Sequence, residues 1–413
     1  MPYEKAIQTP LPGGCMGYMS IGKEELAVAT ELLTQPEKLW RYRENSYTTR
    51  FEQEACALTG AKHALFVNSG TSALSCCLAA LAIGPGDEVI VSAYTYIATA
   101  SACIEVGAVP IPCEIDESLG LDPEAVEKRI TPYTKAVILT HMQGVPGRVD
   151  AVRAVAKKHG LYMIEDCCQA IGARYHGKYC GAESDAFAWS LNYFKNITCG
   201  EGGCFFTSDD DAYARGYYQS DPAGVMWGNG IGDGSSVPYF TRAGYRASEL
   251  CGGVAWAQLQ KLEGNLAVTR ALKKSLLAQL NGPKHYQLQF VDDPEGDCGV
   301  SFAVIANSKE ECKALTEALA REGLTVGSAY SAAFPDRHIF TYWEGIVKRH
   351  GATPKNYPWN DPAYHGTADY SADACPRTLD ILSRSLRLSL NQAMSEQNIR
   401  EIAEAFNRAD ASF

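Results

Sequence analysis

The segment NSGTSAL, residues 68–74, combines a glycine with hydroxyl side chains where an apolar run gives way to a helical pattern. The apolar run ends at Val67 and a helix is predicted to begin near Thr71, which places Gly70 in the turn. Free backbone N–H groups at a helix N-terminus, with hydroxyls beside them, suit a phosphate group. An ordinary strand-to-helix turn with a Ser or Thr cap explains the same residues equally well.

Asp166 closes a second apolar segment, LYMIED. A carboxylate at the end of a strand can face the ligand-binding edge of a sheet. Beside a pyridine nitrogen it would favour the protonated ring and so make the ring an electron sink. A helix N-cap or a structural ion pair is the more common role of an isolated aspartate.

Lys195 lies within the segment WSLNYFKNITCGEGG, after Ser190 and before a glycine-rich turn at 200–203. In apolar and aromatic surroundings the lysine would lose solvation, which favours a free amine able to form a Schiff base. Ser190 closes another apolar run, and its hydroxyl can donate to a phosphate. For a single lysine, a surface position with the charge extended into water is the more common case.

The elements that must hold these side chains alternate between residues 61 and 207. Seven short apolar runs are predicted as strands: 63–67, 88–92, 109–115, 136–141, 162–166, 185–190 and 203–207. Helical stretches separate several of them: 71–83, 97–106, 123–130 and 149–159. This alternation indicates an α/β domain with a mostly parallel seven-stranded sheet. The active site of such a sheet lies beyond the carboxyl ends of its strands.

The pattern changes after about residue 208. Residues 212–247 are predicted as irregular loops, and one long helix is predicted from about 248 to 280. The remainder is predicted as a smaller α+β domain with strands at 286–291, 300–305 and 386–390 and helices at 309–322 and 395–409. With 413 residues, two domains are expected: 1–250, an N-terminal segment and a large cofactor-binding domain, and 251–413, a linking helix and a small domain. The polar and aromatic insertion at 351–375 is expected to be functional or interfacial and to help form a substrate pocket.

Composition excludes several classes of protein. The net charge of −11 argues against nucleic acid as a partner, although a local basic pocket could hold a phosphorylated substrate. No apolar stretch is long enough for a membrane span, and the first residues do not resemble a signal peptide. Fifteen cysteines without a CxxC pair predict free thiols in a reducing cytoplasm, with neither a disulfide framework nor a metal site.

The phosphate turn, the aspartate about one hundred residues later and the lysine about thirty residues after that occur in one order along the sheet. In this order, and in five segments, the sequence resembles the sugar aminotransferases of the DegT/StrS family, which have the fold type I of pyridoxal 5′-phosphate (PLP) enzymes. The segments are NSGTSAL, GPGDEVIVSAYTYIATASA, TKAVILTHMQGVPGRVD, IEDCCQAIGA and SLNYFKNITCGEGG. The resemblance runs from about residue 15 to 262, with a looser similarity to the end.

The resemblance implies a role for individual residues. Lys195 would carry PLP as a Schiff base and Asp166 would pair with the ring nitrogen. The other implied cofactor contacts are Gln169 near the ring hydroxyl, Tyr96 on the ring face, and Gly70, Thr71 and Ser190 at the phosphate. Candidate substrate contacts are His141, Asn192 and His338, of which the two histidines are equally explained as structural residues.

One position departs from the family pattern. In the family segment Asn-Tyr-Arg-Met, the asparagine reaches the phosphate of the partner subunit, but this chain has Gly244 at that position. Arg242, Tyr245 or a water molecule could supply the missing donor.

The resemblance further implies an activity and an assembly. The activity would be transfer of an amino group from an amino acid, glutamate or glutamine, to a keto sugar, a nucleotide-linked sugar or a cyclitol. The enzyme would be a homodimer, or a dimer of dimers, with sites between subunits. Two alternatives are a pyridoxamine-dependent sugar dehydratase and a PLP-fold protein without catalysis; dehydratases of the family usually replace the lysine, and a regulatory protein needs none.

Overall fold

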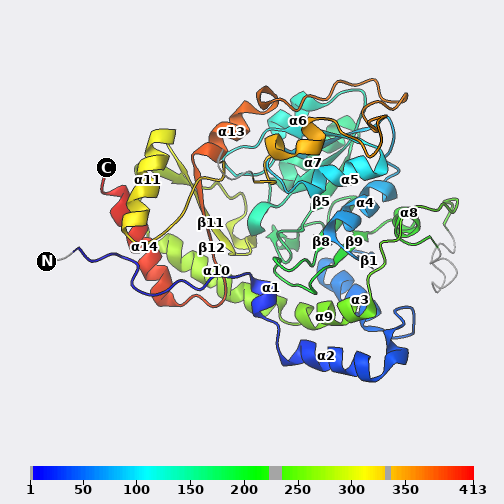
Figure 1. Ribbon diagram of the computed structural model, residues 1–413, viewed down its shortest axis with the longest axis horizontal. Coiled ribbons are helices and arrows are strands. Elements are labelled where there is room, and N and C mark those ends of the chain that lie inside the picture. The colour runs from blue at the N-terminus through cyan, green and yellow to red at the C-terminus, as the bar shows by residue number, and fades with distance from the viewer. Residues whose placement is uncertain (1–2, 223–234, 331–335) are drawn as a thin grey trace.

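The computed structural model describes residues 3–222, 235–330 and 336–413. Its main feature is a seven-stranded sheet in the order β1-β9-β8-β5-β4-β2-β3 (Figure 1). The strands are β1 (His63–Val67), β2 (Glu88–Ser92), β3 (Val109–Cys113), β4 (Thr134–Thr140), β5 (Tyr162–Asp166), β8 (Ala186–Ser190) and β9 (Gly203–Thr207). Only β9 runs antiparallel to its neighbours, β1 and β8. The predicted α/β class with a mostly parallel seven-stranded sheet is therefore confirmed.

Alternating burial explains why the strands form a central layer. In β1, Leu65 and Val67 belong to one hydrophobic cluster, whereas Ala64 and Phe66 belong to another. Successive side chains of a strand point to opposite faces, so both faces of the sheet are covered. The covering helices include α4 (Gly70–Ala80), α5 (Ala98–Val106), α6 (Pro123–Arg129), α7 (Val149–His159) and α8 (Asp210–Ser220).

The C-terminal part has its own core around an antiparallel three-stranded sheet in the order β10-β11-β12. The strands are β10 (Tyr286–Leu288), β11 (Ser301–Ala306) and β12 (Ser385–Ser389), and the helices are α10 (Leu262–Ala278), α11 (Lys309–Arg321) and α14 (Glu396–Asp410). Figure 1 shows this sheet with α11 and α14 at the end of the molecule opposite α8. The division of the chain at residues 250 and 251 stays a prediction.

The N-terminal segment joins the two parts. The backbone N–H of Ala6 donates to the Glu322 carboxylate at 2.9 Å, and the Asn391 amide donates to the carbonyl of Pro12 at 2.8 Å. The same segment continues through α1 (Met16–Met19) to the loop after β8, where the N–H of Gly17 donates to the carbonyl of Lys195 at 3.0 Å. The first residues of the chain therefore pack on the C-terminal part before they reach the large sheet.

Two helix predictions are wrong in detail. Part of the predicted loop 212–247 forms α8, where Gly216 lies against the ring of Phe205 so closely that a Cβ would approach it to 2.4 Å. Glycine here permits close packing of helix on sheet instead of ending the helix. The single helix predicted at 248–280 is two, α9 (Glu249–Leu259) and α10, separated at Lys261, whose amine binds Glu25 at 2.8 Å. The sequence also gave no prediction for α3 (Tyr47–Thr59).

The insertion at 351–375 packs against the amino ends of β2 and β3, at the edge of the sheet opposite the one where an active site is expected. The hydroxyl of Tyr364 donates to Glu88, the first residue of β2, at 2.8 Å. The hydroxyl of Tyr370 donates to the carbonyl of Pro110 near the start of β3 at 2.9 Å. Because ligands bind beyond the carboxyl ends of such strands, the expectation that this insertion forms part of the substrate pocket is wrong for the protomer.

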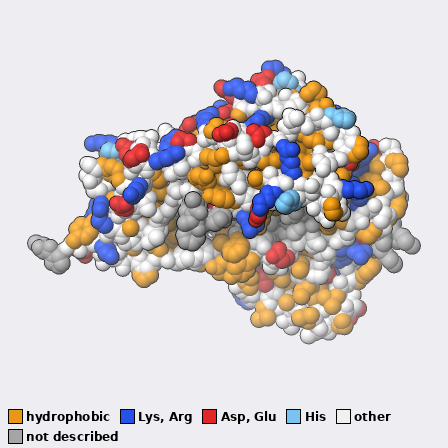
Figure 2. All heavy atoms as spheres, turned by 45° about the horizontal axis from the view of Figure 1, so that its top comes forward, with side chains coloured by type: hydrophobic (Ala, Val, Ile, Leu, Met, Phe, Trp, Pro, Cys, Tyr) orange, Lys and Arg blue, Asp and Glu red, His pale blue; other side chains and the backbone are white. Residues whose placement is uncertain are grey.

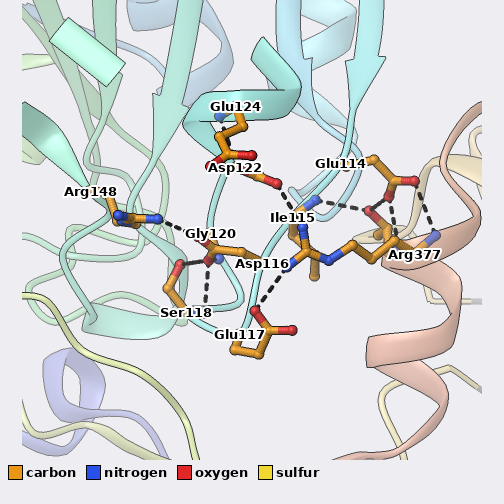
Figure 3. Close-up of polar contacts among 11 residues, drawn as sticks. Glu114, Ile115, Asp116, Glu117, Ser118, Gly120, Asp122, Glu124, Arg148 and Arg377 are labelled. Carbon is orange, nitrogen blue, oxygen red and sulfur yellow. Dashed lines mark hydrogen bonds and ion pairs between the residues drawn. The ribbon is translucent and has the colours of Figure 1, made fainter. Parts of the chain in front are cut away.

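A polar network fixes the C-terminal part to the large sheet through the loop after β3 (Figure 3). Arg377, in α13 (Pro376–Ser383), binds Asp122 at 2.7 Å and Glu117 at 2.9 Å. The carboxylate of Glu114 accepts hydrogen bonds from the N–H groups of Arg377 and Thr378 at 3.0 and 2.6 Å. Glu114 thus caps α13 from another element, where a negative charge is favourable. Because α13 leads directly into β12, this cap also positions β12.

Within the described ranges, none of the helices combines the length and the apolar character that a bilayer crossing requires.

Candidate active site

A cavity of about 710 Å³ opens beyond the carboxyl ends of β1, β5 and β8. Most of the residues predicted for the site line it: Gly70, Thr71, Tyr96, Asp166, Gln169, Ser190, Asn192, Lys195 and His338. These residues come from distant parts of the sequence, so the sheet topology brings them together. The size is in the range of small-molecule binding sites.

The turn at Gly70 forms one end of the cavity. The hydroxyl of Ser69 accepts a hydrogen bond from the N–H of Ser72 and so caps α4. A Cβ on Gly70 would lie 2.6 Å from the Cβ of Ser190, and a Cβ on Gly203 would lie 2.2 Å from the carbonyl oxygen of Ser69. Both glycines are therefore required for the N-terminus of α4 to lie against the ends of β8 and β9. This contact aligns helix N–H groups with the Ser190 hydroxyl, an arrangement suited to a phosphate.

Asp166 lies on the floor of the cavity with both carboxylate oxygens hydrogen-bonded. One oxygen accepts from the hydroxyl of Thr99 at 2.7 Å, and the other accepts from the N–H of Cys168 at 3.0 Å. Thr99 is itself bonded to Thr95, which continues to Thr140 on β4. Because Asp166 is buried, the hydrogen bonds from Thr99 and Cys168 orient its carboxylate toward the cavity.

Lys195 projects into the same cavity from the loop between β8 and β9. Both polar groups of its backbone are hydrogen-bonded: the N–H donates to the carbonyl of Asn192, and the carbonyl accepts from the N–H of Gly17. A Cβ on Gly17 would lie 2.5 Å from that carbonyl, so no larger residue fits there. The aromatic residues that precede Lys195 are open to solvent in the protomer, as Phe194 is 68% exposed and Tyr193 is 46% exposed.

The remaining predicted residues occupy the rim and the walls. The side-chain oxygen of Gln169 accepts from the N–H of Gln143 at 3.3 Å, and the amide of Asn192 donates to Glu201 at 2.9 Å. Tyr96 is half exposed, with its ring centroid 5.2 Å from that of His338.

His338 is held by an acidic neighbour on the wall. Its Nδ1 lies 2.6 Å from the Asp336 carboxylate. Burial would raise the pKa of Asp336, but the hydrogen bonds from His338 outweigh burial and hold this pKa below its ordinary value.

His141 is not brought to the cavity. It is fully buried, its Nε2 donates to the Glu165 carboxylate at 2.8 Å, and its Nδ1 accepts from the N–H of Gly147 at 2.9 Å. With both ring nitrogens occupied, His141 has no group left for a substrate. The prediction of a substrate contact is corrected in favour of the structural alternative.

Several residues that line the cavity were not found by the sequence reasoning, and Thr99 and Arg387 are two of them. Thr99 belongs to the segment YTYIAT, so its position next to Tyr96 was a usable signal. Arg387 comes from β12, far away in the sequence, and had no signal. Burial raises the pKa of the Cys15 thiol, and the positive charges of Lys195 and Arg387 oppose this rise, so both cations face the same wall.

Comparison with known proteins adds independent evidence. Residues 20–353 match the model of the DegT/DnrJ/EryC1/StrS aminotransferase family. The spore coat polysaccharide biosynthesis protein SpsC of Bacillus subtilis (strain 168) is 43% identical over 192 residues, which is 46% of this chain and 48% of that protein. The alignment thus spans about half the length of this curated relative.

Two solved structures are similar over nearly the whole chain. One is 3-amino-5-hydroxybenzoic acid (AHBA) synthase, with 27% identity, a TM-score of 0.75 and coverage of 95% of this chain and 98% of that chain. The other is S. venezuelae DesV in complex with a ketimine intermediate, with 29% identity, a TM-score of 0.71 and coverage of 93% of each chain.

Proposed function

The chain belongs to the DegT/DnrJ/EryC1/StrS aminotransferase family, and on this basis we propose that it is a PLP-dependent aminotransferase. Its substrates would be an amino acid donor, glutamate or glutamine, and an acceptor that is a keto sugar, a nucleotide-linked sugar or a cyclitol. The observation that carries the proposal is the convergence of Lys195, Asp166 and the Gly70 turn on one cavity. The structural relatives named above support the same reaction class.

The residues around the cavity fit PLP. The cradle at Gly70 is too narrow for a Cβ and offers N–H groups of α4, with the hydroxyls of Thr71 and Ser190, to the phosphate. Asp166 would pair with the ring nitrogen. The other contacts would be made by Gln169 at the ring hydroxyl, Tyr96 on the ring face and Lys195 at the aldehyde. When bound, PLP supplies an electron sink for a carbanion at the donor's α-carbon.

The protein's own side chains would then orient the donor and move a proton. The amine of Lys195 would remove the proton from the donor's α-carbon. In the second half of the reaction it would deliver a proton to the acceptor carbon that receives the amino group. Thr99 and Cys168 would keep the Asp166 carboxylate in position throughout. The exposed guanidinium of Arg387 would bind the donor's carboxylate, because planar carboxylates match its paired N–H groups.

The assembly belongs to the same proposal. We propose a homodimer or dimer of dimers, supported by apolar surface on the protomer. Figure 2 shows hydrophobic side chains gathered at the lower end of the molecule, where Figure 1 places α2 (Lys23–Thr34). On α2, Leu26 is 68% exposed and Leu33 is 63% exposed. A cytoplasmic location is also proposed, supported by fifteen cysteines that are all free.

The partner's phosphate contact at Gly244 would be supplied by Arg242. Gly244 is exposed and a Cβ there would meet no atom within 4 Å, so the position is open to a second subunit. Tyr245 is buried, and its hydroxyl binds Glu105 within its own protomer, which corrects the alternative that Tyr245 is the donor. The Arg242→Ala variant should bind PLP about ten- to a hundred-fold more weakly. Unchanged affinity would exclude Arg242 from this role.

The decisive experiment uses the purified holoenzyme. Addition of glutamate or glutamine should convert the absorbance of bound PLP to that of the pyridoxamine form and release the keto acid. Lys195→Ala should lose both changes, whereas Lys313→Ala, an exposed lysine of α11, should behave as the native protein. A panel of keto sugars and cyclitols then regenerates the PLP form and identifies the acceptor.

The same measurements separate the alternatives. A dehydratase would release a dehydrated sugar without an amino product, and a protein without catalysis would show no spectral change with any donor. If Lys195→Ala kept the native turnover, the assignment of the lysine would be wrong.

A further inference from the structure

Helix α1 contacts both the lysine loop, residues 191–202 between β8 and β9, and the chain that follows β12. On one side, the N–H of Gly17 donates to the carbonyl of Lys195 at 3.0 Å, and a Cβ on Gly17 would lie only 2.5 Å from that oxygen. On the other side, the carbonyl of Met16 accepts from the side-chain nitrogen of Gln392 at 3.0 Å. Gln392 comes shortly after Arg387 of β12, so α1 connects the strand that would bind the donor with the loop that carries the lysine.

The side chain of Gln392 makes its hydrogen bonds through the nitrogen alone. The nitrogen donates to the Met16 carbonyl and to the Ser20 hydroxyl, at 3.0 and 3.1 Å. The oxygen is buried and has no hydrogen-bond partner among the described residues. A buried unpaired oxygen costs stability, and a methionine of similar length would avoid this cost. The Met16 carbonyl would keep a partner without Gln392, because the Ser20 hydroxyl also donates to it at 2.7 Å. Gln392 is therefore unfavourable for stability here, which points to a role in function.

The two contacts of α1 fix a distance on which proton transfer depends. Arg387 would hold the donor's carboxylate, and the α-carbon that loses its proton is bonded directly to that carboxylate. The amine of Lys195 must therefore lie at a set distance from Arg387 when the donor is bound. Arg387 is fixed on β12, where it pairs with Ala303 of β11. Cys15 and Met16 line the cavity together with Lys195 and Arg387, so the α1 region is part of the wall between the two cations.

We propose that Gln392 is a positioning residue, which through α1 sets Lys195 relative to Arg387. The proposal rests on the proposed aminotransferase function, since it concerns the lysine as the base of that reaction. Gln392 acts through α1, because it is not among the cavity-lining residues in the described part of the chain. The phosphate cradle at Gly70 and the carboxylate of Asp166 belong to the large sheet and are held without α1. Loss of the Gln392 contact should therefore slow proton transfer and leave the affinities for PLP and donor unchanged.

The first test compares the native holoenzyme with Gln392→Met. Hydrogen exchange in a peptide that contains Gly17 should accelerate about two- to ten-fold, because one hydrogen bond that holds α1 is lost. The maximal rate of the donor half-reaction should fall about two- to ten-fold, while the donor concentration for half-maximal rate and the PLP dissociation constant stay native. The denaturant midpoint should stay the same or rise, because the unpaired oxygen is removed. The matched control Gln260→Met, at an exposed glutamine that follows α9, should keep the native exchange and the native rate.

Gly17→Ala acts on the same path from the side of the lysine. The added methyl group would lie 2.5 Å from the Lys195 carbonyl oxygen, so it separates α1 from the lysine loop while the Gln392 bond remains. A displacement of about 1 Å lowers the maximal rate up to about a hundred-fold. The double variant should be slower than Gly17→Ala by no more than about two-fold, because two changes on one path do not add.

Three results would overturn the proposal: an unchanged maximal rate in Gln392→Met, a lowered denaturant midpoint in Gln392→Met, or full additivity of the two substitutions. A lowered midpoint would identify Gln392 as a residue that serves stability. The exchange measurement does not depend on the reaction. If the proposed function failed, the native holoenzyme would show no half-reaction, whereas failure of the Gln392 proposal alone leaves the native half-reaction intact.

Discussion

The Gly70→Ala substitution tests the phosphate cradle with the smallest possible change. It adds one methyl group at the first residue of α4, at a position with ordinary helical geometry, so the backbone itself is not strained. The methyl group would lie 2.6 Å from the Cβ of Ser190 and 3.0 Å from the sulfur of Cys168. Ser190 ends β8 and Cys168 follows β5, and the nearer atom, the Cβ of Ser190, is fixed by its backbone.

The expected magnitude follows from these distances. Two carbon atoms normally approach to about 3.5–4.0 Å, so α4 must move away from β8 by about 1 Å. Overpacking of this kind costs about 1–3 kcal/mol of folding stability. The movement also separates the α4 N–H groups from the Ser190 hydroxyl. Loss of one hydrogen bond to a charged phosphate is worth about 1.5–3 kcal/mol, which is about ten- to a hundred-fold in affinity for PLP.

The assay compares PLP dissociation constants and denaturant midpoints of the native protein, Gly70→Ala and Gly264→Ala. Gly264 is also helical and exposed, and a Cβ there meets nothing within 4 Å. Gly264→Ala should leave PLP affinity unchanged and should stabilise the protein by up to about 1 kcal/mol, because alanine favours helix over glycine. If Gly70→Ala bound PLP as tightly as Gly264→Ala, the reasoning from close packing of α4 on β8 would be refuted.

Three further outcomes are expected. Asp166→Asn should keep the denaturant midpoint, since the amide oxygen can accept from the N–H of Cys168 and the amide nitrogen can donate to the Thr99 hydroxyl. It should lower turnover by several orders of magnitude because the electron sink depends on the charged carboxylate; a near-normal rate would contradict this role. Arg387→Ala should raise the KM for the amino donor about ten- to a hundred-fold with a smaller effect on kcat, and an unchanged KM would remove Arg387 from carboxylate binding. Hydrogen bonds lower the pKa of Cys251, in α9, to about 6, so its alkylation by iodoacetamide should accelerate as pH rises through about 6 and the thiolate forms. A midpoint near that of an ordinary thiol would contradict this lowered pKa.

The large sheet could be predicted from the sequence because its strands are short, apolar and separated by helices of regular period. The strands at 63–67, 88–92, 162–166 and 203–207 agree with the structure to the residue. Since parallel strands end at one edge, the pattern placed Asp166 and Ser190 at the same edge of the sheet. That their strands, β5 and β8, are neighbours is known only from the structure.

Contacts between distant segments left no local signal. Arg387 reaches the cavity from β12, which is held by its pairing with β11 and by the α13 helix that Glu114 caps. From the sequence alone Gly216 indicates the end of a helix, whereas in the structure it lets α8 pack closely on the ring of Phe205. His141 has the side chain of a catalytic residue, and only its buried partners identify it as structural. The sequence reveals residue types, whereas these roles depend on the neighbours that folding supplies.

The N-terminal segment has a consequence for the order in which parts of the protein fold during synthesis. Pro12 is synthesised well before its partner Asn391, from which it is separated by 379 positions. Gly17 donates to Lys195, and the carbonyl of the preceding Met16 accepts from the amide of Gln392 at 3.0 Å, so both parts hold the segment beside Lys195. Contacts of such long sequence separation form late, because the loop must close before they contribute. The lysine loop should therefore become ordered only after β12 and the residues that follow it have been made, and nascent chains stalled before β12 should contain the sheet without a finished site.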